Sequence, residues 1–467
     1  MTLNFLAISM SCCRRAIAML CAMLLVWLPA VAVPTDEISD AAVKQLATHW
    51  QWLRLLHVPQ AGRPSDIRSQ DFFLSEQGHT DSVAELRATL RAYAMPWDGS
   101  PDSHARCRFP ARYRWLSQHV DLPGYTRRDA RCQRFEQWAR LDQLQSISVM
   151  LISGYFGNPA STFGHALIKF NTGQGDAAGL LDLSINYGAL VPENEWAPAY
   201  VLRGLFGGYE AAFSDKLHYA NDLVYARTEF RDAWDYQLEL DEQARELLVM
   251  HLWEVVGRKL TYYFLTDNCA YHIAELLELA TGARLLARSS VWYIPVEMFH
   301  RLDEAQQRGG KRLVSGVRFV ASAERSLRHR LAAQAPADAL AMMEAIGNAA
   351  TNLPHTLQPL PPERAPAVLD TLLAYYEYQI AAEAPAARPA LLEAKDRVLR
   401  HRLSLPGAEP VEPAIPPLPS PAAATAPMEV AVGLGHATRG ASFLRMRWAP
   451  VSYDFASFNA LETGELT

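Results

Sequence analysis

The spacing of hydrophobic and polar residues divides the chain into helix-forming and strand-forming parts. Residues 36–140 show the spacing of amphipathic helices, as in DAAVKQLATHWQWLRLLH and SVAELRATLRAYA. From residue 146 the pattern changes to β-rich runs separated by Gly, Asn and Pro, namely SISVMLISGYFG, HALIKFNTG and LLDLSINYGAL. Helical spacing returns in LDEQARELLVMHLWEVVGRKL, where Asp241 suits an N-cap. The pattern therefore predicts an α+β protein with helices on both sides of a sheet-forming region.

The pattern also predicts how the rest of the chain is organised. Further amphipathic runs predict a helical region at 311–406, and the proline-rich residues 407–428 predict a semi-rigid linker rather than a folded element. Residues 429–467 alternate around Gly turns, which predicts a β-hairpin-like segment that is either short in itself or the truncated start of a β domain. Upstream of these segments we expect a helical lead-in domain at 33–140 and a catalytic domain at 141–310.

The first 32 residues have the pattern of an export signal. Two arginines precede an apolar run from Ala16 to Leu28, and Ala30-Val31-Ala32 gives the small-x-small sequence that signal peptidase cuts. An uncleaved membrane anchor is the alternative, but Pro29 interrupts a run that is short for a membrane span. We therefore expect a periplasmic or cell-envelope protein whose mature chain starts near Val33.

Composition and motifs exclude several classes of function. Of the 467 residues, 50% are hydrophobic, which is enough for a large core, and a net charge of −6 gives no electrostatic footprint for nucleic acid. The Gly-containing stretch SGYFGNPASTFG lacks the Lys and the spacing of a phosphate loop, so we expect no nucleotide. Neither GxSxG nor HExxH occurs, which argues against serine-hydrolase and zincin chemistry. We expect no cofactor.

Three cysteines remain after removal of the predicted signal. Cys107 and Cys132 both lie in polar, Arg-rich surroundings and close a modest loop, so we expect them to form a disulfide in an oxidising compartment. Cys269 is then left alone. It is either a small buried hydrophobe or a reactive thiol, and its position in the sequence favours the second interpretation.

The stretch TDNCAYHIAELLELA places Cys269 in the first turn of a helix, with Thr266, Asp267 and Asn268 available as caps. A helix N-terminus favours the thiolate, because its unpaired N–H groups stabilise negative charge. A base is expected from a facing strand, and His165 opens the run HALIKF.

Two residues of the next predicted strand are candidates for a third, orienting group. Asn186 and Asp182 both lie in or next to LLDLSINYGAL, four residues apart and so on the same face. We favour Asn186 as the orienting residue.

Two further features are open to more than one interpretation. His272 and Glu275 resemble a metal-binding i,i+3 pair, but no third ligand is in view, so we interpret them as part of a helix face and expect no metal. The Gly- and aromatic-rich residues 200–213 are either a lid or lipid-facing loop or an ordinary packed loop.

Several motifs together carry a resemblance to a known family. STFGHALIKF, INYGAL, RDAWDYQLEL and YYFLTDNCAYHIAELLE occur in this order and resemble the Lnb N-terminal periplasmic domain family, named for bacterial lipoprotein N-acyltransferases. CRFPARYRWL is similar to the proteobacterial branch of that family, and the resemblance spans roughly residues 65–300. An Asn-Cys pair at a helix start, preceded in the chain by a strand histidine, is also similar to the permuted papain-like group that includes lecithin retinol acyltransferase. The resemblance implies an antiparallel sheet packed on a nucleophile helix.

The resemblance implies thiol acyl transfer at a membrane surface, with Cys269 as nucleophile and His165 as base. A thioester formed from a lipid ester would be resolved by an amine or by water, with a phospholipid or lipoprotein as substrate. We expect substrate or oxyanion contacts from Asn268, Gly164 and Tyr187. Two alternatives are a thiol amidase or peptidase acting on peptidoglycan or envelope peptides, and a non-enzymatic envelope scaffold.

Overall fold

The structure is a computed structural model that describes most of the chain after the predicted signal. The described residues are 38–96, 101–122, 131–155, 157, 159–173, 179–192, 194–286, 292–307, 310–405, 414–436, 440–449 and 452. The predicted signal at 1–32 lies outside them. The chain forms two units, Met1–Gln45 and Leu46–Thr467, and the description below concerns the second. Among the described residues, no helix combines the length and the hydropathy needed to span a bilayer.

The region before the sheet is helical, as its hydrophobic spacing predicts. Its elements within the second unit are α3 (Trp50–Leu55), η1 (Gln70–Phe72), α4 (Ser82–Ala94), η2 (Pro101–Ser103), α5 (Ala105–Arg108), α6 (Pro110–Ser117) and α7 (Gln133–Ala139). Asp81 caps α4 by accepting from the amides of Val83 and Ala84. Cys107 and Cys132 form the expected disulfide, with their Cα atoms 5.3 Å apart.

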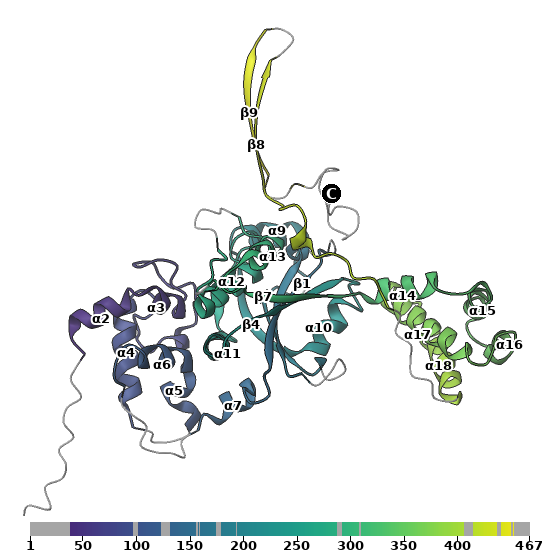
Figure 1. Ribbon diagram of the computed structural model, residues 1–467, viewed down its shortest axis with the longest axis horizontal. Coiled ribbons are helices and arrows are strands. Elements are labelled where there is room, and N and C mark those ends of the chain that lie inside the picture. Colours follow the sequence, from purple (N-terminus) through teal and green to yellow (C-terminus); the bar gives the residue numbers. More distant parts are fainter. Residues whose placement is uncertain are drawn as a thin grey trace, which may run out of the picture. The chain divides into compact units, whose positions relative to one another are not determined.

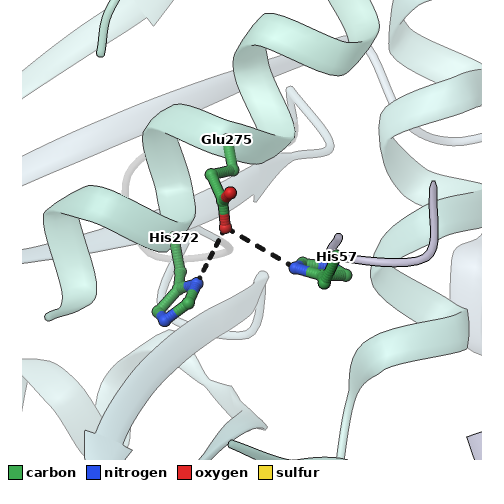
Figure 2. Close-up of side chains that lie close together, drawn as sticks. All are labelled: His57, His272 and Glu275. Carbon is green, nitrogen blue, oxygen red and sulfur yellow. Dashed lines mark hydrogen bonds and ion pairs between the residues drawn. The ribbon is translucent and has the colours of Figure 1, made fainter. Parts of the chain in front are cut away.

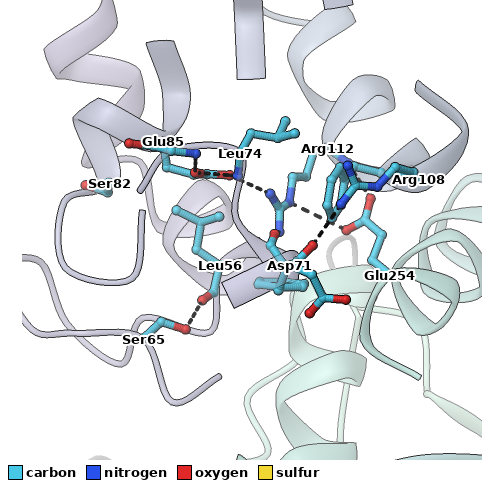
Figure 3. A network of polar contacts seen from close by, with 12 residues as sticks. Leu56, Ser65, Asp71, Leu74, Ser82, Glu85, Arg108, Arg112 and Glu254 are labelled. Carbon is cyan, nitrogen blue, oxygen red and sulfur yellow. Dashed lines mark hydrogen bonds and ion pairs between the residues drawn. The ribbon is translucent and has the colours of Figure 1, made fainter. Parts of the chain in front are cut away.

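A buried ionic network fixes this helical region against the rest of the protein (Figure 3). The guanidinium of Arg112 is fully buried; it donates to Glu85 Oε1 at 2.8 Å and to the carbonyl of Phe72 at 2.9 Å. Glu254, on α11 (Glu242–Val255), accepts from the backbone amides of Ala111 and Arg112. Because a buried charge is costly without partners, this network determines how α4, α6 and α11 pack together.

The central element is a seven-stranded antiparallel sheet with the strand order β6-β4-β3-β2-β1-β5-β7. Its strands are β1 (Ser146–Ile152), β2 (His165–Asn171), β3 (Leu183–Ala189), β4 (Tyr209–Leu217), β5 (Ala233–Leu238), β6 (Lys259–Tyr262) and β7 (Val314–Val320). The α+β class is confirmed. The sheet continues past the expected domain boundary at residue 310, because β7 pairs with β5.

The two faces of the sheet are covered differently. On one face, Ala166 and Ile168 of β2 belong to the main core, which they share with α12 (Cys269–Thr281), α11 and α13 (Pro295–Glu304). On the other face, Leu167 joins a smaller apolar cluster that packs against Tyr225 of α10 (His218–Tyr225). Because side chains alternate along a strand, His165 shares the α10 face with Leu167 and not the face covered by α11, α12 and α13.

The chain leaves the sheet after β7 and returns to it. The helices α14 (Ala323–Ala332), α15 (Pro336–Gly347), α16 (Leu353–Leu357), α17 (Ala365–Ala382) and α18 (Arg388–Ser404) follow, and α15 to α18 share a core of their own. The described part of the proline-rich segment contacts the sheet and α13: Trp234 Nε1 donates to the carbonyl of Leu418 at 3.2 Å, and η4 (Pro421–Ala423) packs near α13. Strands β8 (Glu429–His436) and β9 (Ser442–Ala449) then form the expected hairpin (Figure 1).

Candidate active site

Cys269 begins α12, and Asn268 is the residue that caps this helix. The side-chain oxygen of Asn268 accepts from the amides of Ala270 at 3.1 Å and Tyr271 at 3.3 Å, as an N-cap requires. Its side-chain nitrogen donates to the carbonyls of Phe264 and Tyr293. All polar groups of the Asn268 side chain are thus used to hold the helix start, which leaves this amide no free donor for an oxyanion.

The sulfur of Cys269 meets the sheet at the start of β2. Its Sγ accepts a hydrogen bond from the amide of Ala166, with N and S 3.5 Å apart. The pairing of β2 with β3 begins only at Leu167, and the amide of the preceding residue, Ala166, is bonded to Sγ instead. The thiol is free and 2% exposed. The nucleophile candidate therefore lies directly beside the backbone of the residue that follows His165.

The imidazole of His165 is held by Asn186. Its Nε2 lies 3.3 Å from Asn186 Oδ1, and the amide nitrogen of Asn186 donates to Asn221 Oδ1 at 3.0 Å. With the amide assigned in this way, Nε2 carries the proton and Nδ1 keeps a lone pair that can act as a base. Asp182, the other option for an orienting group, instead accepts from Thr172 Oγ1 at 2.7 Å. The structure thus places Asn186, and not Asp182, against the imidazole.

Burial keeps both reactive groups uncharged at neutral pH. It raises the pKa of the Cys269 thiol to about 11, although the amides of Ala166 and Ala270 and the charge of Arg231 lower it. Burial also lowers the pKa of His165 to about 4, and Arg231 adds to this effect. The expectation that the helix start keeps the sulfur ionised is therefore wrong for this closed site, because desolvation outweighs the helix dipole. Among the described residues, no hydrogen bond joins Sγ to the imidazole, which is bonded to Asn186.

Gly164 and Tyr187, the other residues expected to contact the substrate, have different surroundings. Gly164 has a φ of +89°, and a Cβ there would lie 2.9 Å from the carbonyl oxygen of Ile152, so the position requires glycine. Its amide donates to the carbonyl of Ser161. Tyr187 is fully buried on the α12 face, with its ring 4.6 Å from that of His272. The Gly164 amide is therefore already used, whereas the buried hydroxyl of Tyr187 has no hydrogen-bond partner among the described residues.

The stretch 200–213 consists of part of α9 (Ala197–Leu205), a turn and the start of β4. Around α9, Trp196, Leu202 and Phe206 are 72%, 57% and 78% exposed. The same helix contacts the loop between β6 and α12, which leads to Cys269: the amide of Phe264 in this loop donates to the carbonyl of Gly204 at 2.8 Å. An exposed apolar surface therefore lies on the element that packs against the residues leading to Cys269.

Comparison with known families agrees with this organisation. Residues 134–305, which contain every strand of the central sheet except β7 and the whole of α12, match the Lnb N-terminal periplasmic domain. This match fits a periplasmic protein of the cell envelope. Residues 44–119 match a second family, described as Domain of unknown function (DUF7843). No curated protein and no solved structure matches the chain.

Proposed function

We propose that the protein is a cysteine-dependent acyltransferase or lipid-ester hydrolase with a permuted papain-like core. The observation that carries this proposal is the position of the free Cys269 thiol. It lies at the start of a capped helix and accepts a hydrogen bond from the amide of Ala166, the residue that follows His165 in β2. Asn186 orients the imidazole, and the histidine precedes the cysteine in the chain, as in a permuted arrangement. A nucleophile, a base and an orienting amide are the three roles that such chemistry needs.

The neutral state of both groups determines how the first step proceeds. Nδ1 of His165 takes the thiol proton as Sγ attacks the ester carbonyl, and the imidazolium then protonates the alcohol that leaves. This requires Nδ1 and Sγ to approach each other when substrate binds, a tightening that is common in sites without ligand. The amides of Ala166, Ala270 and Cys269 all act on the resting sulfur. Because the Ala270 amide donates to Asn268 Oδ1, the amides of Ala166 and Cys269 are the proposed donors for the oxyanion.

The second step releases the acyl group from the thioester. Nδ1 of His165 takes a proton from the incoming amine or water, whose N or O attacks the thioester carbonyl. The C–S bond breaks, and the departing sulfur recovers a proton from the imidazolium. The same imidazole thus acts as base and acid in both half-reactions, while Asn186 keeps the Nε2 proton in place.

The exposed surface of α9 favours a lipid over a peptide as acyl donor. Trp196, Leu202 and Phe206 present large apolar side chains to solvent beside the loop that leads to Cys269. Large apolar side chains that stay exposed on one short element are a feature of surfaces that contact membranes or other proteins. Since Cys269 is almost fully buried, the acyl chain reaches Sγ only when residues over the site move. We propose that contact of α9 with a membrane surface accompanies this movement.

Acyl trapping tests the proposal. The full chain is incubated with vesicles whose phospholipids carry a labelled acyl chain, and the label is mapped by mass spectrometry. We expect a hydroxylamine-sensitive label on Cys269 that is lost in Cys269→Ala and strongly reduced in His165→Gln. His218→Gln is the matched control, because burial lowers the pKa of His218 to about 4 as well. The Nδ1 of His218 is hydrogen-bonded to the hydroxyl of Ser184 and not to the thiol.

Two results would replace the proposal with its alternatives. Release of peptides from peptidoglycan that depends on Cys269, without lipid label, would identify a thiol amidase. A folded Cys269→Ala variant that keeps the full cellular function of the protein would identify a scaffold.

A further inference from the structure

A second buried cluster of functional groups lies on the nucleophile helix (Figure 2). His272 and Glu275 of α12 face His57, which follows α3, and the three side chains are 1%, 3% and 2% exposed. Glu275 Oε2 lies 3.0 Å from His272 Nδ1 and 3.6 Å from His57 Nδ1, and the three ligand atoms lie within 4.8 Å of one another. The third ligand that local sequence spacing lacks is therefore supplied by the region matched as the second family.

Hydrogen bonds outside the cluster hold the ring of His57. Glu254 is paired with buried Arg112, so its carboxylate accepts, and His251 Nδ1 donates to Glu254 Oε2 at 2.9 Å. The other ring nitrogen of His251, Nε2, lies 3.2 Å from His57 Nε2. A hydrogen bond in which His57 Nε2 is the donor leaves His57 Nδ1 with a lone pair that can bind a metal ion.

Two nitrogens of the cluster are left without a suitable partner. His57 Nδ1 faces Glu275 Oε2 at 3.6 Å, and this nitrogen has no hydrogen-bond partner among the described residues. Within the same part of the chain His272 Nε2 is also unpartnered, although the residue is almost fully buried. His272 lines a cavity of about 250 Å³, whose other lining residues include Asp66, Asp267, Arg68 and His79. Two acceptors that face each other in the interior are unfavourable unless a cation lies between them.

We propose that His57 Nδ1, His272 Nδ1 and Glu275 Oε2 bind a divalent transition metal ion of the zinc class. Two imidazoles and one carboxylate are a ligand set that zinc takes, and they leave a fourth tetrahedral position for water. Binding at His272 Nδ1 moves its proton to Nε2, where it can be donated into the cavity that Asp66 and Asp267 also line. The ion thus gives His57 Nδ1 a partner and gives His272 Nε2 a proton to donate.

The residues around the ligands have the roles of supporting groups in a metal site. His57 is oriented through His251 and Glu254, and Arg54 holds the second oxygen of Glu275. Such outer contacts fix the tautomer and direction of each ligand. The ion would join the helical lead-in region to the helix that carries Cys269. This site does not depend on the acyltransferase proposal.

Metal analysis of the full chain tests the site. The protein is purified without chelators or metal-affinity resin, and its metals are quantified by inductively coupled plasma mass spectrometry. We expect about one zinc-class ion per chain. The ion should be lost in His57→Gln and His272→Gln but retained in His218→Gln, in which another buried histidine is replaced. His251→Phe, which removes an outer contact, should weaken zinc affinity about 10–100-fold.

A measurement on the unmodified chain covers the case in which these variants fail to fold. Removal of the ion with 1,10-phenanthroline should lower the unfolding temperature, and added Zn²⁺ should restore it. X-ray absorption should show only nitrogen and oxygen ligands at about 2.0–2.2 Å. A chain without stoichiometric metal whose unfolding temperature ignores Zn²⁺ would overturn the proposal. So would a sulfur ligand at about 2.3 Å, or folded His57→Gln and His272→Gln variants that keep the ion.

Discussion

The reactivity of the Cys269 thiol should depend on pH in a way that follows from its burial. Burial raises the pKa of this thiol to about 11 from its ordinary value of 9.0. At pH 8 the thiolate fraction is then about 0.001, against about 0.1 for an unperturbed thiol, so alkylation should be about a hundredfold slower from ionisation alone. Because the thiolate is the nucleophile, the rate should rise about tenfold per pH unit from pH 7 to 10 without a plateau.

Alkylation with iodoacetamide gives a direct measurement. Samples of the folded chain are quenched at intervals and the Cys269 peptide is quantified by mass spectrometry, with circular dichroism to confirm folding at each pH. Cys107 and Cys132 are protected by their disulfide. The denatured chain is the reference, and its rate should level off above pH 9. His165→Gln should leave the slope unchanged, because the pKa of His165, lowered to about 4, keeps the imidazole neutral throughout this range.

A level rate between pH 6 and 8 that falls in His165→Gln would refute this reasoning. Such a profile would mean that Cys269 and His165 form a thiolate–imidazolium pair in the resting protein. The same raised pKa has a consequence for stability. The folded chain keeps the thiol proton where the unfolded chain releases it, so this group's stabilising contribution is complete below pH 9 and is lost as the pH rises towards 11.

Three other substitutions test the packing around the site. Arg112→Ala should lower the free energy of unfolding in urea by about 3–5 kcal/mol, because it leaves buried glutamates unpaired. Arg258→Ala, which removes the more exposed ion pair with Asp71, should lower it by about 1 kcal/mol or less. Equal losses for the two variants would contradict the importance of the buried network. Reduction of Cys107–Cys132 should cost about 3.5 kcal/mol by the loop-entropy relation, and an unchanged urea midpoint would argue against it. Asn268→Ala should cost about 1–2 kcal/mol through loss of the helix cap, and Asn268→Asp, which keeps the accepting oxygen, should cost less. A thermal melt in which the two Asn268 variants coincide would show that the cap oxygen is unimportant.

The local sequence pattern predicts many of the strands and helices, but it does not predict the charge state of the groups at the site. The strands containing His165 and Asn186 and the helix start at Cys269 follow from period-2 alternation and from a cap residue, both of which are local signals. β7 was missed because most of its side chains are exposed and it has no buried alternation to detect. The neutral thiol was missed because burial depends on residues distant in sequence.

The metal candidate shows the same limit. His272 and Glu275 are visible as an i,i+3 pair, whereas His57 reaches them only through packing of the lead-in region. A pattern search within one helix finds two ligands and cannot find a third that comes from another part of the fold. The useful sequence signal would have been a buried-type histidine after an amphipathic helix, which is too common to be decisive.

The helices between residues 323 and 405 form an insertion, because the chain leaves the sheet before them and contacts it again after them. Trp234 of β5 lies beside Phe319 of β7, with ring centroids 5.6 Å apart, and its Nε1 donates a hydrogen bond to the carbonyl of Leu418. The segments before and after the insertion thus both contact Trp234, and helices α15 to α18 of the insertion have an apolar core of their own. Segments anchored at neighbouring points are those that evolution and protein engineering can exchange as whole modules. We therefore expect that α15 to α18 can be replaced by a short connection while the sheet and the cysteine-bearing helix keep their supports.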